Sequence, residues 1–197
     1  MMCKFMSFLP FLFAVMSLLG QNMKPKVEVQ QIDYAYQDQD VSARKLTVIS
    51  HIPIDRELAW ANVQTPALLQ YVAKGIFQFR AAEGMLPHTW QEGQTYGVKM
   101  RLFGLFPIGG THYLYIETVD ESSGRISTRE WDEKIHVWNH EILIKEQPNG
   151  TIYYEDRITI YAGSMTGLVT RFAKQFYLHR QRRWQKVARK QLDFSPS

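Results

Sequence analysis

Two titratable side chains lie in otherwise apolar stretches in the second half of the chain. His140 lies in the run Trp138-Asn-His140, and Asp156 lies two residues after Tyr154 in the next apolar run. A histidine next to a carboxylate can act as an acid/base pair or can anchor the polar group of a ligand. The same two residues could instead form a structural cross-strand pair or face water at strand ends.

The residues between these two runs predict a β-hairpin, because Asn149-Gly150 is a strong turn signal between strands rich in β-branched and aromatic residues. Since residues two apart in a strand share a face, one side of each strand is apolar apart from its titratable group. These faces consist of Trp138, His140, Ile142 and Ile144 on the first strand and of Tyr154, Asp156, Ile158 and Ile160 on the second. An apolar surface with a few placed polar groups is typical of a ligand cavity.

The turn decides how the two titratable groups face one another. A three-residue turn at 147–149 would place His140 directly opposite Asp156. A two-residue Asn149-Gly150 turn would require a bulge to keep both groups on one face.

The residue patterns of other predicted strands indicate the rest of the apolar surface. Tyr96–Leu102 alternates with Met100 on its inward side, and Thr111–Asp120 places His112 on a face with two apolar residues. A further strand at 125–131 carries polar residues on both faces. A lone histidine in a strand is more often bonded to a neighbour, but His112 is also a candidate for the cavity. The candidate ligand-binding residues are therefore Trp138, His140, Tyr154, Asp156, His112 and Met100.

Helices are predicted both before and after these strands in the sequence. A strand at Lys45–Ile52 is followed by Asp55, a good N-cap for one short helix, and by Thr65-Pro66, a start signal for a second. The chain closes with a long amphipathic helix that begins at Gly163-Ser164. These elements predict an α+β fold in which a strongly curved antiparallel sheet grips a long C-terminal helix, with two short helices after the first strand.

Positive charge is concentrated in that last helix. The net charge is +4, yet residues 164–192 hold eight of the 23 basic residues and no acidic one. This helix could contact an anionic membrane surface through Arg180, Arg182, Arg183 and Lys186, and a nucleic acid is a less favoured partner. A solvated helix end explains the same charges, because cations are favourable near a helix C-terminus.

An apolar run at residues 5–19 follows Lys4 at the start of the chain. It is typical of a secretory signal peptide or an anchor, and it is shorter than the roughly 20 residues of a transmembrane helix. The alternative is translation from Met23. We expect a secreted, periplasmic or membrane-associated protein in the first case and a cytoplasmic one in the second.

The predicted organisation has four parts. They are a leader or mis-assigned start at 1–22, a polar N-terminal segment at 23–43 with one short strand at Val27–Ile32, a ligand-binding domain at 44–192 and a tail at 193–197. The single cysteine, Cys3, excludes an internal disulfide, and no Cys/His cluster has the spacing of zinc ligands. We therefore expect no metal and no cofactor.

The predicted order of elements, together with three local motifs, resembles that of the START-like or SRPBCC superfamily of helix-grip proteins. This superfamily includes polyketide cyclase/dehydrase-like members. The motifs are Ile52-Pro-Ile-Asp-Arg-Glu-Leu-Ala-Trp60, then Leu86-Pro87-His-Thr-Trp90-Gln-Glu-Gly93, and then Trp138-Asn-His140 followed by Gly150-Thr151 and Asp156. The resemblance covers residues 44–191. It implies a hydrophobic cavity between the sheet and the C-terminal helix.

The strand faces and the resemblance together indicate that the protein binds or carries a small hydrophobic or amphipathic ligand. No residue is assigned a catalytic role on this interpretation. The alternative is a cyclase/dehydrase-type enzyme in which His140 and Asp156 serve as acid and base.

Overall fold

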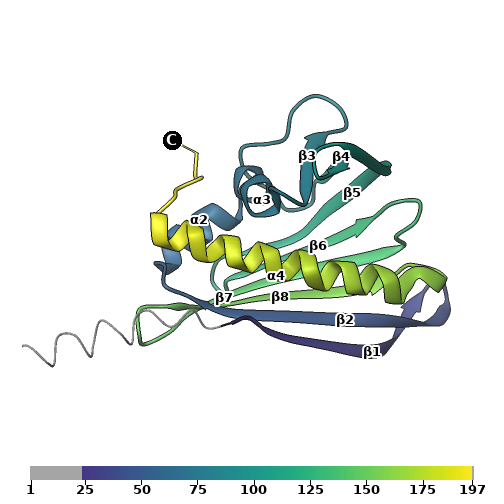
Figure 1. The fold of residues 1–197 in the computed structure, drawn as a ribbon, viewed down its shortest axis with the longest axis horizontal. Helices are drawn as coiled ribbons and strands as arrows, with labels where there is room; N and C mark the ends of the chain where they lie inside the picture. The colour runs from purple at the N-terminus through teal and green to yellow at the C-terminus, as the bar shows by residue number, and fades with distance from the viewer. Residues whose placement is uncertain (1–23, 197) are drawn as a thin grey trace, which may run out of the picture.

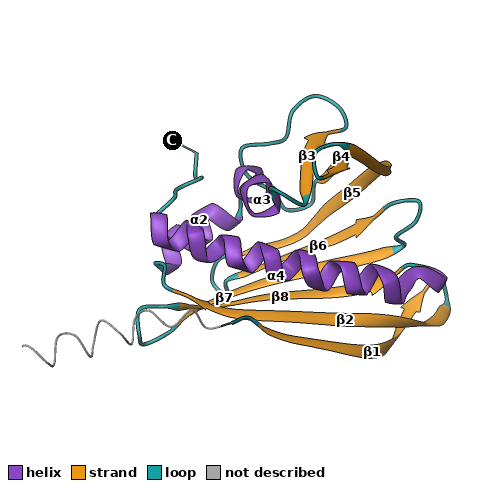
Figure 2. Cartoon of the chain, viewed as in Figure 1, coloured by secondary structure: helices purple, strands orange, loops and turns teal. Residues whose placement is uncertain are grey.

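The computed structural model describes residues 24–196, and the predicted leader at 1–22 lies outside the described residues. Within residues 24–196, eight strands form one antiparallel sheet that curves around a long helix (Figures 1 and 2). The strands are β1 Lys26–Tyr36, β2 Gln39–Ile52, β3 Phe77–Ala81, β4 Thr95–Leu102, β5 Phe106–Asp120, β6 Arg125–Trp131, β7 Val137–Glu146 and β8 Ile152–Tyr161. The helices are α2 Arg56–Val63, α3 Pro66–Ala73 and α4 Thr166–Lys190, the last preceded by a short 3-10 turn at Gly163–Met165.

The strand order β1-β2-β8-β7-β6-β5-β4-β3 places β2 beside β8, so the β1–β2 hairpin at one edge of the sheet pairs with the β7–β8 hairpin. Helix α4 runs along the concave face, and α2 and α3 lie near its C-terminal half (Figure 1). The predicted fold class, an α+β helix-grip architecture, is confirmed.

Both edges of the sheet are larger than the sequence patterns predicted. β1 extends the short strand expected at Val27–Ile32 and pairs along its whole length with β2, so the polar segment at 23–43 is an edge hairpin. Its outward side chains are exposed, which explains the polar composition. At the other edge, β3 forms where no strand was expected, with Phe77 and Phe79 facing inward and Gln78 and Arg80 outward.

Helix starts follow the predicted capping residues. The Oδ1 atom of Asp55 accepts hydrogen bonds from the backbone N–H groups of Glu57 at 2.8 Å and Leu58 at 3.0 Å. The hydroxyl of Thr65 accepts from the N–H of Leu68 at 3.1 Å, and Pro66 occupies the first helical position. These caps satisfy donors that have no partner inside the helix.

The register of the β7–β8 hairpin differs from the predicted one. Residues 147–151 connect the strands, and Asp156 pairs with Ile142, whereas His140 pairs with Ile158. Neither predicted turn is formed: the pairing differs by two residues from the one that a three-residue turn at 147–149 would give, so His140 does not lie directly opposite Asp156. A shift of two keeps every side chain on its face, so both groups still point inward as diagonal neighbours. The turn is longer than the three residues of the predicted turn because the Asn149 side chain accepts hydrogen bonds from the backbone N–H and the hydroxyl of Thr151.

The end of the chain packs against the domain. Asn62 of α2 donates its side-chain N–H to the Leu192 carbonyl at 3.0 Å and accepts from the Phe194 N–H at 2.6 Å. The Phe194 ring lies 5.1 Å from that of Tyr71. Part of the segment predicted as a tail at 193–197 therefore packs against the core.

The β5–β6 turn requires glycine at position 124. Gly124 has a φ of +65°, and an added Cβ would overlap the carbonyl oxygen of Ile144. We expect Gly124→Ala to destabilise the fold by about 1–2 kcal/mol for the left-handed backbone and about 1–3 kcal/mol more for the overlap. The matched control is Gly104→Ala, because Gly104 has a φ of +72° and no described atom lies within 4 Å of its added Cβ. Equal losses in urea denaturation of the two variants would contradict this account.

Candidate functional site: an apolar cavity with two polar clusters

A cavity of about 550 Å³ lies between α4 and the inner face of β3 to β7. This volume is within the range of ligand pockets, about 300–1,000 Å³. Its wall is mostly apolar and includes Leu68, Phe79, Met100, Leu114, Ile116 and Ile142. Apart from Leu68, which is a buried residue of α3, these positions are the inward members of their strands, so the apolar wall follows from strand alternation.

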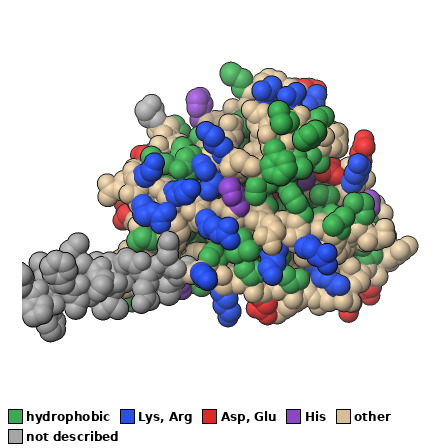
Figure 3. Space-filling model, in the orientation of Figure 1, with side chains coloured by type: hydrophobic (Ala, Val, Ile, Leu, Met, Phe, Trp, Pro, Cys, Tyr) green, Lys and Arg blue, Asp and Glu red, His purple; other side chains and the backbone are tan. Residues whose placement is uncertain are grey.

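One end of the cavity opens to solvent beside the first turns of α4. Leu168 and Phe172 line the cavity and are 62% and 39% exposed. On this face of the molecule, hydrophobic side chains gather over the region of β3 to β5, and lysine and arginine side chains are spread along α4 (Figure 3). The exposed Phe103, Leu105 and Phe106 occupy the nearby β4–β5 hairpin. Large apolar side chains at an opening are typical of an interaction or entry site.

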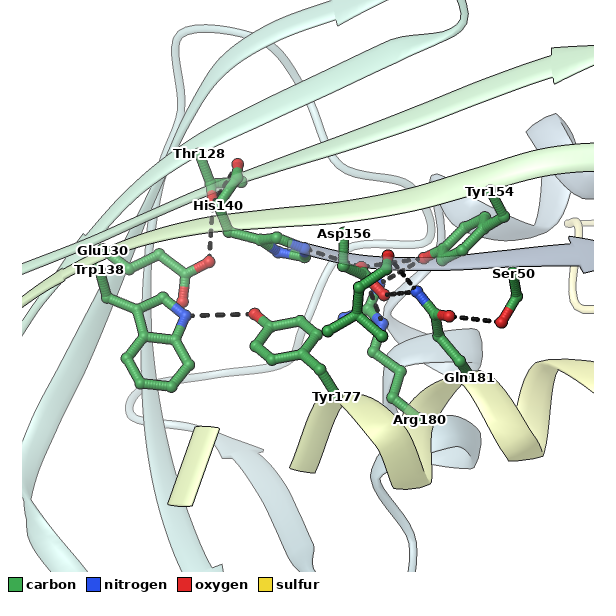
Figure 4. Close-up of polar contacts among 11 residues, drawn as sticks. Ser50, Thr128, Glu130, Trp138, His140, Tyr154, Asp156, Tyr177, Arg180 and Gln181 are labelled. Atoms are coloured by element: carbon green, nitrogen blue, oxygen red, sulfur yellow. Dashed lines mark hydrogen bonds and ion pairs between the residues drawn. The ribbon is translucent and has the colours of Figure 1, made fainter. Parts of the chain in front are cut away.

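The deep part of the site contains a buried hydrogen-bond network, the Asp156 cluster, which consists of His140, Tyr154, Asp156, Arg180 and Gln181. Asp156 accepts hydrogen bonds from His140 Nε2 at 2.9 Å, the Tyr154 hydroxyl at 3.2 Å and Gln181 Nε2 at 3.0 Å. Arg180 Nη2 donates to the Tyr154 hydroxyl at 3.2 Å, and its Nε lies 3.6 Å from Asp156 Oδ1. Tyr177, Arg180 and Gln181 project from α4 toward the strands that carry His140 and Asp156 (Figure 4). The cluster therefore joins the helix to the sheet.

Electrostatics keep Asp156 ionised although it is fully buried. Burial acts to raise the pKa of Asp156, but the Arg180 charge and the hydrogen bonds from His140 and Gln181 outweigh burial and lower the pKa. Burial acts to lower the pKa of Arg180, and the neighbouring Tyr154 and Asp156 raise it overall. Both partners of this ion pair are charged in the folded protein.

A second group, the His112 cluster, lies on the cavity wall and consists of His112, Thr128, Glu130 and Asp132. The two ring nitrogens of His112 contact Glu130 Oε2 and Asp132 Oδ2, each at 3.1 Å. Thr128 donates its hydroxyl to the other Glu130 oxygen at 2.6 Å. Burial acts to lower the pKa of His112, but the two carboxylates raise it to about 9.

The raised pKa of His112 predicts a loss of stability at alkaline pH. A folded pKa above the unfolded value of 6.5 contributes stability that is complete below pH 6.5 and is lost as pH rises to about 9. The loss should be on the order of 3 kcal/mol in the free energy of unfolding. Urea denaturation at both pH values should show this loss in the wild type and in His88→Gln, an exposed control, but not in His112→Gln. A pH dependence unchanged by His112→Gln would contradict the assignment.

The structure places four of the six predicted residues on the cavity wall. Trp138, His140, His112 and Met100 line the cavity. Tyr154 and Asp156 lie behind the wall and are completely buried between the sheet and α4. Whether the four wall residues contact a ligand stays a prediction, and Tyr154 and Asp156 can act on a ligand only through their neighbours.

Sequence patterns missed the helix side of the site. The last helix was predicted from apolar residues at helical spacing, among them Phe172, Phe176 and Trp184. Phe176 and Trp184 are separated by more than two helical turns, which leaves a gap in this pattern. Arg180 and Gln181 fill that gap on the sheet-facing side, and both are buried. Because an amphipathic helix buries one residue every three or four, this interruption indicates an inward polar pair. Glu130 was missed too, although strand alternation places it two residues from Thr128 on the inner face.

The buried position of Arg180 corrects one predicted membrane contact. Arg180 is 5% exposed, so it cannot bind an external surface. Arg183 is half-buried, donates to the Tyr71 carbonyl at 2.6 Å and lies over the Tyr71 ring at 4.2 Å. Of the four residues predicted to face a membrane, Arg182 and Lys186 are exposed.

Among residues 24–196, no helix is long and apolar enough to cross a membrane. In the same part of the chain, no group of three or more His, Cys, Asp or Glu side chains is arranged to hold a metal ion.

Comparisons with known proteins identify the fold. No protein-family model matches the sequence, and no curated protein matches it. A START superfamily protein from Mycobacterium smegmatis is similar in structure, with a TM-score of 0.56 at 8% identity, over 75% of this chain and 99% of that protein. Protein Ms6760 from the same organism has a TM-score of 0.56 at 13% identity, over 73% of this chain and 89% of that protein. Major latex-like protein 151 from Panax ginseng has a TM-score of 0.52 at 12% identity, over 74% of this chain and 97% of that protein.

The chain therefore has the START-like helix-grip fold, as its sequence motifs suggested. Identities this low establish the fold alone, and a fold hosts many functions.

Proposed function

We propose that the protein binds a small hydrophobic or amphipathic molecule in the cavity between α4 and the sheet. The observation that carries the proposal is the cavity itself, about 550 Å³ with a mostly apolar wall. A well-packed domain core has few voids larger than a water molecule, so a space of this size is unexpected in a purely structural interior. Its open end beside Leu168 provides an entry path.

Binding to a neutral fluorescent probe tests this proposal. Nile red should bind saturably with one site per chain, and hydrophobic competitors should displace it. Trp138 and Trp90 line the cavity, so their fluorescence should fall as the probe enters. Unsaturable binding, or binding that leaves the tryptophan fluorescence unchanged, would argue for non-specific surface adsorption instead.

An enzymatic role is the second candidate, because the cavity-lining His140 donates to a buried carboxylate behind it. A carboxylate that orients a histidine is a frequent acid/base arrangement. In this alternative His140 alone would contact the substrate and Asp156 would position it. Product formation from a bound ligand that stops in His140→Gln, while Nile red affinity is retained, would support the enzyme. Retained turnover in His140→Gln would exclude His140 as its acid or base.

A further inference from the structure

Arg180 has more hydrogen-bond donors than its protein neighbours use. A guanidinium carries five N–H donors in a fixed planar arrangement. Among residues 24–196, its hydrogen-bond partner is the Tyr154 hydroxyl, reached by Nη2 at 3.2 Å. The Nε atom is buried and makes no hydrogen bond with the described residues. An unsatisfied buried donor costs about 1–3 kcal/mol, and more for a charged group.

Asp156 does not relieve this shortage. Its oxygens already accept hydrogen bonds from His140, Tyr154 and Gln181. Its nearest approach to Arg180 Nε is 3.6 Å, which is an electrostatic contact beyond hydrogen-bond distance. The acid of the ion pair thus accepts three hydrogen bonds, whereas the base makes one with the described residues.

The buried Nε atom faces Asp156 and is out of reach of a ligand. Arg180 nevertheless lines the cavity, and its Nη1 atom makes no hydrogen bond with the described residues and is not fully buried, so a ligand in the cavity can supply an acceptor for this donor. We propose that the ligand carries an oxygen acceptor, a ketone, ester or amide carbonyl, and that Arg180 donates to this oxygen. This inference rests on the proposed function, since it specifies the ligand of the same cavity. It also assigns Arg180 as a specificity-determining residue.

The charges around the cavity favour a neutral carbonyl over a carboxylate. The His112 cluster holds one positive and two negative formal charges, and Arg180 adds one positive charge, so the described wall is balanced. Asp156 behind the wall adds one negative charge. These groups therefore hold no net positive charge for a carboxylate, and burying an unpaired charge is costly.

The geometry also orients the ligand. Arg180 lies twelve residues after Leu168 on α4, which corresponds to about 18 Å along the helix. The carbonyl therefore lies at the deep end, and an apolar chain extends along the wall toward the mouth at Leu168 and Phe172. An extended amphipathic molecule with its polar group inside fits this arrangement.

A matched set of probes tests the inference. Methyl laurate, laurate and tridecane have similar chain lengths and differ in the polar group, and each can be measured by displacement of Nile red. Wild-type protein should bind methyl laurate about ten-fold or more tightly than tridecane, because a hydrogen bond to a charged donor is lost with the hydrocarbon. It should also bind methyl laurate more tightly than laurate. The carbonyl stretching frequency of bound methyl laurate should be lowered by the hydrogen bond.

Two variants locate the donor. Arg180→Met combined with Asp156→Asn removes both charges and avoids an unpaired buried ion. In this double variant the ester and the hydrocarbon should bind with similar affinity, and the carbonyl frequency should rise. Arg182→Met, which removes an exposed arginine of the same helix, should keep the ester preference. If the double variant does not fold, the ratio of the wild-type affinities for methyl laurate and tridecane and the carbonyl frequency of bound methyl laurate still test whether the ligand's carbonyl accepts a hydrogen bond.

The outcomes separate this inference from the proposed function. Equal affinity of wild-type protein for methyl laurate and tridecane would overturn the carbonyl assignment and leave the cavity function standing. Tighter binding of laurate than of methyl laurate would overturn the neutral head group. Failure of all three to displace Nile red would count against the proposed function as well.

Discussion

Replacing Asp156 with asparagine should lower the free energy of unfolding by about 3–5 kcal/mol, the usual cost of removing one partner from a buried ion pair. Asp156 is the acceptor for three donors and the charge partner of Arg180, all of them buried. An asparagine side chain keeps the volume but loses the charge and half of the acceptor capacity. Arg180 would then be an uncompensated buried cation.

Chemical denaturation measures this effect, and the chain supplies its control. Asp33→Asn makes the same chemical change on the exposed side of β1 and should alter the free energy of unfolding by no more than about 0.5 kcal/mol. Adding Arg180→Met to Asp156→Asn should recover part of the loss, because it removes the unpaired charge. A loss in Asp156→Asn as small as that in Asp33→Asn would show that the Asp156 cluster does not join α4 to the sheet.

The second prediction with a large expected effect is that filling the cavity prevents ligand binding. Ile142→Trp should abolish or weaken Nile red binding at least ten-fold, because Ile142 lines the cavity and an indole there occupies part of its volume. Its cost in folding stability should be small, since the larger side chain can extend into existing space. The control is Ile144→Trp on the same face of β7, where the side chain is 1% exposed and does not line the cavity.

The two variants should show opposite effects on folding stability and on Nile red affinity. Ile144→Trp overpacks a filled core and should destabilise the protein by about 1–3 kcal/mol or more, with the affinity for Nile red retained in the folded fraction. Ile142→Trp should retain stability and lose affinity. Unchanged Nile red affinity in Ile142→Trp would place the probe outside the cavity.

Sequence patterns predicted the elements that depend on local chemistry. The caps at Asp55 and Thr65 and the shared inward face of His140 and Asp156 depend on residue types and on strand periodicity alone. The order of elements then indicated a sheet that grips the last helix, and the structure confirms this fold class.

The predictions that were wrong concern features that depend on packing between segments distant in the sequence. The β7–β8 register depends on a side-chain hydrogen bond of Asn149 that closes a longer turn. Edge strands such as β1 and β3 depend on their pairing partners, which local composition does not specify. Arg180 was assigned to the surface because its charge matched its neighbours, and its burial depends on Asp156, 24 positions earlier in the chain. Polar groups of the core are therefore recognisable from the sequence mainly as gaps in an apolar stripe.

The central claim is that the cavity holds a hydrophobic ligand, and native mass spectrometry of the protein purified from its own host tests it most directly. We expect an added mass of one small molecule per chain that is released on denaturation, can be extracted into organic solvent and is absent from Ile142→Trp purified in the same way. Wild-type protein that carries no added mass, and acquires none when incubated with methyl laurate or a lipid extract of the host, would contradict the claim.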